Sequence, residues 1–189
     1  MQQYSVSAIL PFRDHEEVIG TAVARVARHL RERNIDFELL AVDADSRDNS
    51  AALLSLIRPQ HPELQLLAAP PRLAHEHAVR EARGRVLWLS TPDLLDPSLE
   101  AFDDAYARIT KGACDLLVAR ERIALGYRRQ LVEIFRGMRT HGDKLPRSLV
   151  GRARRRGLRV EERPSRHERS DKRDWFQPLI AAFSFNRTA

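Results

Sequence analysis

Short apolar runs alternate with longer segments of helical periodicity along most of this chain, and this alternation constrains its fold more than any other feature. The runs predicted as strands cover residues 6–10, 37–42, 64–68, 86–89, 116–119 and 158–162. The segments predicted as helices cover residues 16–33, 49–57, 73–83, 97–110, 128–139 and 147–156. Parallel strands need crossover connections, and strands buried on both faces are apolar throughout. We therefore predict an α/β fold with a mostly parallel sheet and helices on both faces.

The length and composition suit one domain. The chain has 189 residues, 43% of them hydrophobic, which is enough for one core. We expect residues 1–162 to form this domain and residues 163–189 to form a basic, partly ordered tail. The single cysteine, Cys114, excludes an intramolecular disulfide. The sequence shows neither a signal-peptide pattern nor a run of about eighteen apolar residues, so we expect a cytoplasmic protein.

The positive charge is concentrated in one C-terminal segment. The formal net charge is +6, and residues 146–174 hold eleven basic and five acidic residues, which accounts for all of this excess. Such a segment attracts phosphate groups on a sugar nucleotide, a lipid or a nucleic acid. Aromatic residues are scarce, at 6%, and none interleave with the arginines, which argues against nucleic acid. The alternative interpretation is a solvated arginine-rich helix followed by a loose tail.

Polar residues gather directly after several predicted strands. They are Arg13, Asp14, His15 and Glu16 after the first strand, Asp43 and Asp45 after the second, Ser90, Thr91 and Asp93 after the fourth, and Arg120, Glu121 and Arg122 after the fifth. Open α/β sheets bind ligands beyond the carboxyl ends of their strands. Any one of these residues is explained equally well as a loop or capping residue. The joint pattern favours a ligand site.

PFRDHEEVIG (11–20) and VDADSRD (42–48) resemble the PAYNEEENIG opening and the VDDGSTD turn of family 2 glycosyltransferases, which have the GT-A fold, a Rossmann-like nucleotide-diphospho-sugar transferase fold. LAHEHAVREARGRVLWL (73–89) resembles the helix and strand before their metal motif. GACDLLVAR (112–120) and the closing arginine-rich segment resemble the polyprenyl- and dolichol-phosphate sugar transferase branch. The resemblance covers most of residues 4–172.

This resemblance implies a hexosyltransferase that uses a UDP- or GDP-linked sugar and a divalent cation, Mg²⁺ or Mn²⁺. The acceptor would be a lipid phosphate, another phosphorylated compound or a hydroxyl group, and the protein would lie at the inner face of a membrane as a peripheral protein. The implied nucleotide-binding residues are Pro11, Phe12, Arg13, Asp14, Asp43 and Asp45. Arg120 and Arg122 would face phosphate or acceptor, and Asp93 would bind the metal. The resemblance assigns no catalytic residue.

The sequence departs from the family at positions that carry chemistry. The Asp-x-Asp metal motif aligns with Ser90-Thr91-Pro92, so that only Asp93 remains, one position late. Ala44 replaces the second Asp of the turn, and Asp45 stands where the family has glycine. Arg13 either neutralises phosphate directly or forms a surface pair with Asp14 or Glu17. Two hypotheses stay open: an active transferase, and a catalytically silent GT-A homologue that serves as a binding or regulatory module at a partner protein or an anionic membrane surface.

Overall fold

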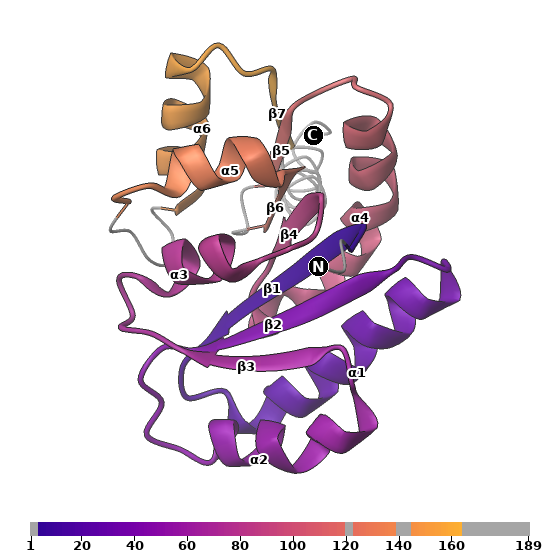
Figure 1. Cartoon of the computed structure of the whole chain (residues 1–189), viewed down its shortest axis with the longest axis vertical. Coiled ribbons are helices and arrows are strands. Elements are labelled where there is room, and N and C mark those ends of the chain that lie inside the picture. The colour runs from indigo at the N-terminus through magenta and orange to yellow at the C-terminus, as the bar shows by residue number, and fades with distance from the viewer. Residues whose placement is uncertain (1–3, 120–122, 139–144, 164–189) are drawn as a thin grey trace, which may run out of the picture.

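The computed structural model describes residues 4–119, 123–138 and 145–163, and its centre is a seven-stranded sheet (Figure 1). The strands are β1 (Val6–Phe12), β2 (Phe37–Asp43), β3 (Leu64–Ala68), β4 (Val86–Leu89), β5 (Leu116–Ala119), β6 (Ile123–Tyr127) and β7 (Val160–Arg163). The helices are α1 (Glu16–Glu32), α2 (Ser50–Ile57), α3 (Ala74–Glu81), α4 (Leu95–Thr110), α5 (Arg128–Phe135) and α6 (Leu145–Arg155), with short 3-10 turns at Arg58–Gln60 and Pro92–Leu94. Of the predicted tail, residues 164–189 lie outside the described residues.

The sheet is mixed and mostly parallel in its first half. Its order is β3-β2-β1-β4-β6-β5-β7. The pairs β1–β2, β1–β4, β2–β3 and β5–β7 are parallel, whereas β6 is antiparallel to both β4 and β5. The predicted α/β fold is confirmed. Because β2, β1 and β4 are parallel neighbours, their carboxyl ends lie next to one another on one edge of the sheet.

Strand β6 is the one element of the described sheet that the sequence analysis did not predict. Its sequence, IALGY, contains Gly126, a residue that weakens any strand signal. A Cβ atom at this position would lie 3.1 Å from the carbonyl oxygen of Asp115 and 3.2 Å from Leu116 Cδ1. The glycine is therefore explained by the close approach of β5 and the turn before it.

Helices cover both faces of the sheet, as the sequence predicts (Figure 1). Helices α1, α2 and α4 pack on one face around a core that includes Trp88 and Phe102, whose ring centroids are 4.4 Å apart. Helices α3, α5 and α6 pack on the other face around a second core that includes Leu89 and Phe135. In α1 the buried positions are Ile19, Ala22, Val23, Val26, Ala27 and Leu30. This is the spacing from which the helix was predicted.

A buried polar network fixes the amino ends of the strands. The Glu38 side chain is fully buried, and its carboxylate accepts hydrogen bonds from Ser7 Oγ (2.6 Å) and Gln65 Nε2 (3.1 Å). The Gly84 amide in turn donates to Ser7 Oγ at 2.7 Å. This network joins β1, β2, β3 and the turn that precedes β4. It holds the sheet at the edge opposite to the polar loops.

No helix in the described part of the chain combines the length and the apolar character that crossing a membrane requires.

Candidate functional site

Three polar loops leave adjacent strand ends at the carboxyl edge of the sheet. Phe12, the last residue of β1, lies opposite Asp43, the last residue of β2, and the Ala44 amide donates to the Phe12 carbonyl at 2.8 Å. On the other side of β1, the Ser90 amide donates to the Ile9 carbonyl at 3.0 Å. The β1 loop therefore lies between the loops that follow β2 and β4. The structure brings together the three segments that the sequence analysis expected to converge.

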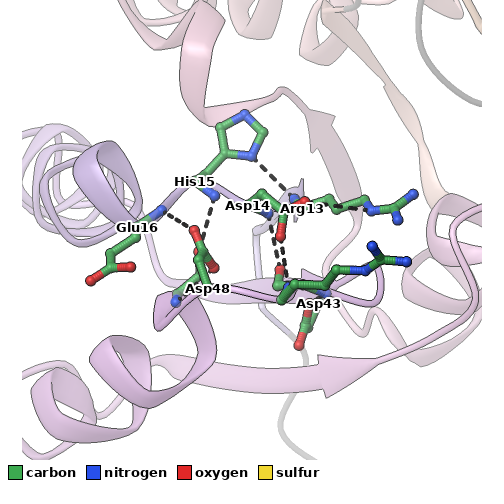
Figure 2. A network of polar contacts seen from close by, with 9 residues as sticks. Arg13, Asp14, His15, Glu16, Asp43 and Asp48 are labelled. Carbon is green, nitrogen blue, oxygen red and sulfur yellow. Dashed lines mark hydrogen bonds and ion pairs between the residues drawn. The ribbon is translucent and has the colours of Figure 1, made fainter.

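The β1 and β2 loops are joined by hydrogen bonds between backbone amides and side chains (Figure 2). The Asp14 amide donates to Ser46 Oγ at 3.2 Å, and the Arg47 amide donates to Asp14 Oδ1 at 2.7 Å. The Ser46 amide donates to Asp43 Oδ1 at 2.9 Å. The backbone and the carboxylate of Asp14 therefore hold the two loops together. Asp43 Oδ2 has no hydrogen-bond or ion-pair partner within the described chain.

Two aspartates in these loops adopt left-handed backbone conformations. Asp14 has φ of 53° and Asp45 has φ of 67°. Aspartate tolerates this region better than most residues other than glycine and asparagine. Asp45 therefore occupies a backbone conformation that suits the glycine of the family turn, and its side chain is exposed at the rim of the site.

Asp48 and Glu16 bind the beginnings of α1 and α2 to each other. The Glu16 amide donates to Asp48 Oδ2 at 2.8 Å, and the Ser50 amide donates to Asp48 Oδ1 at 3.0 Å. In return, the Asn49 amide donates to Glu16 Oε2 at 3.1 Å. Chiefly the hydrogen bond from the Ser50 hydroxyl holds the pKa of the Asp48 carboxyl below its usual range. Asp48 therefore links the beginnings of two helices, a role that the sequence did not indicate.

His15 connects the β1 loop to the β4 loop. Its Nδ1 accepts a hydrogen bond from the Arg13 amide at 3.1 Å, and its Nε2 lies 3.8 Å from Asp93 Oδ1. An Nδ1 that accepts leaves the proton of the neutral ring on Nε2, on the side of Asp93. His15 is one of the polar residues after the first predicted strand but was not among the predicted site residues. The signal was its position within the first polar loop.

The predicted site residues differ in what they can offer to a ligand. Pro11 and Phe12 are buried in β1, and the Phe12 side chain is 1% exposed and belongs to the core. Only their backbone can reach a ligand. Arg13 is exposed, and its Nε lies 3.8 Å from Asp14 Oδ2, so the alternative of a surface pair is present in the structure. Asp43 is half-buried at the end of β2. The predicted phosphate or acceptor residues Arg120 and Arg122 lie outside the described residues.

The described residues do not form a metal centre held by protein alone. They include no group of three or more His, Cys, Asp or Glu side chains arranged to hold a cation. After β4, Ser90 and Thr91 supply only hydroxyl groups, which are poorer ligands for Mg²⁺ or Mn²⁺ than carboxylates. Thr91 Oγ1 is buried without a hydrogen-bond partner among the described residues, and Asp93 lies against His15. The metal-binding role of Asp93 stays a prediction.

The fold is that of the GT-A nucleotide-sugar transferases, as the sequence resemblance implied. The structure is similar to the mannosyltransferase PcManGT from Pyrobaculum calidifontis in complex with GDP-Man and Mn²⁺, with a TM-score of 0.70 and 17% identity over 87% of this chain and 56% of that chain. It is also similar to glucosyl-3-phosphoglycerate synthase from Mycobacterium tuberculosis in complex with Mn²⁺ and UDP-glucose, with a TM-score of 0.64 and 13% identity over 86% of this chain and 69% of that chain.

A third similar structure is TarS from S. aureus, with a TM-score of 0.58 and 14% identity over 85% of this chain and 35% of that chain. No protein-family model and no curated protein sequence matches this chain. The chain spans little more than half the length of PcManGT, at 56%. At these identities the similarity establishes the fold, and function has to be argued from the site.

Proposed function

We propose that this protein binds a nucleotide sugar, UDP- or GDP-linked, at the carboxyl edge of the sheet and acts as a family 2-like glycosyltransferase. The observation that carries the proposal is the placement of three polar loops at adjacent ends of β2, β1 and β4 in a GT-A fold. Two structures with this fold contain GDP-Man or UDP-glucose. The carboxyl edge of a parallel sheet is also where α/β proteins generally bind ligands.

The described residues offer complementary groups to such a donor. Asp43 Oδ2 and the exposed Asp45 carboxylate are acceptors suited to ribose hydroxyls and base N–H groups. The exposed guanidinium of Arg13 is suited to a diphosphate, because it forms charge-assisted hydrogen bonds with phosphate oxygens. Its existing contact with Asp14 is long, at 3.8 Å, and between exposed groups, so that little free energy is lost when it breaks.

We further propose that the acceptor carries a phosphate or hydroxyl group, as in the polyprenyl-phosphate branch, and that the protein works at the inner face of a membrane. The described part of the basic C-terminal segment (residues 146–174) supports a phosphate-bearing acceptor in part. Arg154 and Arg155 of α6 and the following Arg156 are exposed. Arg154 is paired with Glu162, which leaves Arg155 and Arg156 without acidic partners among the described residues. Arg120 and Arg122 are proposed to contact the same phosphate.

A second candidate, a catalytically silent GT-A homologue, is favoured by the β4 loop. The Asp-x-Asp positions hold Ser90 and Pro92, and Asp93 contacts His15. Such a protein would not transfer a sugar. It would act through binding to a partner protein or an anionic membrane surface.

Calorimetric titration with UDP- and GDP-sugars, with and without Mn²⁺, tests donor binding, and donor hydrolysis tests activity. We expect Asp45→Asn to weaken binding by roughly tenfold, the effect of one charge-assisted hydrogen bond. Asparagine keeps the tolerance for positive φ. The matched control is Asp36→Asn, which removes one exposed carboxylate just before the amino end of β2. Binding without hydrolysis favours the silent homologue, whereas no binding of any nucleotide sugar and no hydrolysis reject the transferase.

The double variant Ser90→Asp/Pro92→Asp separates the two candidates further. Carboxylates are the preferred ligands of hard cations, so we expect the restored pair to raise Mn²⁺ affinity by roughly 10- to 100-fold, the range in which even outer contacts change metal affinity. Circular dichroism would verify that the variant folds, because Ser90 is 2% exposed. A folded variant with unchanged Mn²⁺ affinity would favour the silent homologue.

A further inference from the structure

A basic hollow lies at the edge of the sheet opposite to the polar loops. Its volume is about 340 Å³, and it is lined by Arg83, Gly84, Arg85, Tyr127, Arg128 and Arg129. The first three residues precede β4, and the last three end β6 and begin α5. β4 has four residues, so this hollow lies roughly 13 Å from the Ser90 end of the strand at about 3.3 Å per residue. It is therefore separate from the proposed donor site.

The positive charge of this hollow is largely uncompensated. Arg83 lies 3.7 Å from the buried Glu38 carboxylate and donates to Gln65 Oε1 at 3.2 Å. Arg85, Arg128 and Arg129 have no carboxylate within ion-pair distance among the described residues. Four arginines against one carboxylate give the hollow an excess of three positive charges. Arginines placed this close repel one another, and an anion between them removes that repulsion.

Contacts within the fold hold several of these groups in place. The Arg128 guanidinium donates to the carbonyl oxygen of Ala82, and the Arg128 amide donates to the carbonyl oxygen of Arg85 at 2.9 Å. The Tyr127 hydroxyl donates to the carbonyl oxygen of Ile109 at 2.9 Å, which fixes its ring. The guanidinium carbon of Arg129 lies 6.0 Å from the centroid of that ring. Arg128, and to a smaller degree Arg129, are therefore positioned before any ligand arrives, which lowers the entropy cost of binding.

We propose that this hollow binds a phosphate-bearing ligand with at least two negative charges, such as a diphosphate or a small phosphorylated compound. Guanidinium groups match phosphate oxygens with paired, charge-assisted hydrogen bonds. The exposed Arg85 and Arg129 supply the direct contacts, and Arg128 supplies a fixed charge behind them. This assignment does not rest on the proposed transferase function, because none of its residues belongs to the polar loops.

The surroundings of the hollow favour a small ligand over a membrane surface. Peripheral membrane sites combine basic residues with apolar side chains that enter the lipid. In the described chain the large exposed apolar side chains are Val18 and Leu56, which lie on α1 and α2 and not at the hollow. A lipid headgroup and a free phosphorylated compound both present a phosphate group, and the experiment distinguishes these two sources.

Calorimetric titration of the full chain with inorganic pyrophosphate tests the proposal. We expect the double variant Arg85→Ala/Arg129→Ala to bind pyrophosphate at least roughly tenfold more weakly than the wild type, because two charge-assisted contacts are lost. The matched control is Arg28→Ala/Arg58→Ala, which removes two exposed arginines that lack acidic partners among the described residues, and whose affinity we expect to equal that of the wild type.

Three results would overturn the proposal: no binding to the wild type, unchanged affinity in Arg85→Ala/Arg129→Ala, or equal weakening in the control. Unchanged affinity would place the pyrophosphate elsewhere, either at the polar loops or at Arg155 and Arg156. Co-sedimentation with phosphatidylglycerol vesicles identifies the source of the phosphate. Vesicle binding that pyrophosphate displaces, and that the double variant loses, assigns the hollow to a lipid headgroup, and pyrophosphate binding without vesicle binding assigns it to a free phosphorylated compound.

Discussion

At the scale of single residues, Asp14 and Asp43 lie at adjacent strand ends and make different contacts: Asp14 joins two loops, whereas Asp43 holds only its own turn. Their positions after two strands were enough to predict that they lie near each other, because the ends of parallel neighbours meet. The sequence did not indicate that the Asp14 carboxylate accepts a hydrogen bond from the Arg47 amide, while one oxygen of Asp43 stays without a partner in the described chain. These hydrogen bonds depend on the backbone torsions of the loops, and loops lack the sequence periodicity from which helices and strands are predicted.

The loop-holding role of Asp14 can be measured. Asp14→Ala removes the hydrogen bond from the Arg47 amide and leaves φ of 53° to alanine, which lacks the polar side chain that makes this conformation tolerable for aspartate. We expect a loss of about 1–3 kcal/mol in the free energy of unfolding, measured by urea denaturation. The control Asp14→Asn keeps an acceptor and tolerates positive φ, so it should lose less than half as much. Equal stability of the alanine variant and the wild type would show that the contact contributes nothing.

At the scale of helices and strands, the sequence was most informative where each element is buried in a regular pattern. The apolar run of β1 and the helical spacing of Val23, Val26 and Leu30 in α1 predicted both elements. Strand β6 was missed because Gly126 weakens its strand signal, and the contacts that explain this glycine and the antiparallel pairing with β4 form only in the folded chain. The basic hollow was missed for the same reason, because it forms only when the turn before β4 meets the end of β6.

Gly84 illustrates how tightly these elements approach one another. A Cβ atom at Gly84 would lie 2.4 Å from the Ser7 backbone nitrogen, so Gly84→Ala must push β1 away from the turn. We expect a loss of at least about 2 kcal/mol in the free energy of unfolding, since overpacking typically costs 1–3 kcal/mol. Gly20→Ala is the matched control. The nearest atom to its new Cβ is 4.0 Å away, and alanine favours the helix, so a gain of roughly 0.5–1 kcal/mol is expected. Denaturant titration would reveal the opposite signs, and a stable Gly84→Ala would refute the close approach.

His29 on α1 makes the packing of α1 against α4 and β4 sensitive to pH. Its ring centroid is 5.5 Å from that of Phe102, and its side chain is 12% exposed. Burial and then the charge of Arg33 lower the pKa of His29, while Asp103 and Glu32 act in the opposite direction. The folded state thus binds the proton less readily than the unfolded state. The contribution of the neutral His29 side chain to the free energy of unfolding is complete above the unfolded pKa of about 6.5. It is lost as the pH falls through the lower pKa of the folded state.

We therefore expect the free energy of unfolding to decrease as the pH is lowered from about 7 to 5, and the variant His29→Gln to show a shallower decrease, because glutamine does not titrate. Urea denaturation at a series of pH values would measure both slopes. Identical slopes in the wild type and the variant would contradict the assignment of this effect to His29.

At the scale of the whole molecule, the fold and the candidate site were predictable to different degrees. The α/β fold follows from the alternation of strands and helices. The GT-A fold was expected from the resemblance of several stretches, in order, to family 2 glycosyltransferases. The activity does not follow, because it depends on a few side chains in loops, among them Ser90 and Pro92 at positions where the family has carboxylates.

Ligand binding at the polar loops should stabilise the entire domain. A nucleoside diphosphate at about 100 times its dissociation constant adds about 2.7 kcal/mol to the free energy of unfolding. We expect UDP or GDP to raise the melting temperature accordingly. Repeating the measurement in EDTA tests whether a cation held by Asp93 and the diphosphate contributes to this shift. Thermal denaturation with each nucleotide, with and without EDTA, would measure the shift. Its complete loss in EDTA would show that nucleotide binding requires a cation.

The division between the two apolar cores and the hydrogen-bonded loops has a consequence for how such a protein changes over evolutionary time. Residues that secure folding, such as Trp88 and Phe135, lie in the layers between sheet and helices, whereas Arg13, Asp45 and Asp93 lie on the rim. Mutations on the rim therefore escape the selection that preserves folding. A lineage can exchange, weaken or abandon its reaction through a handful of rim substitutions while each descendant still reaches the same native state.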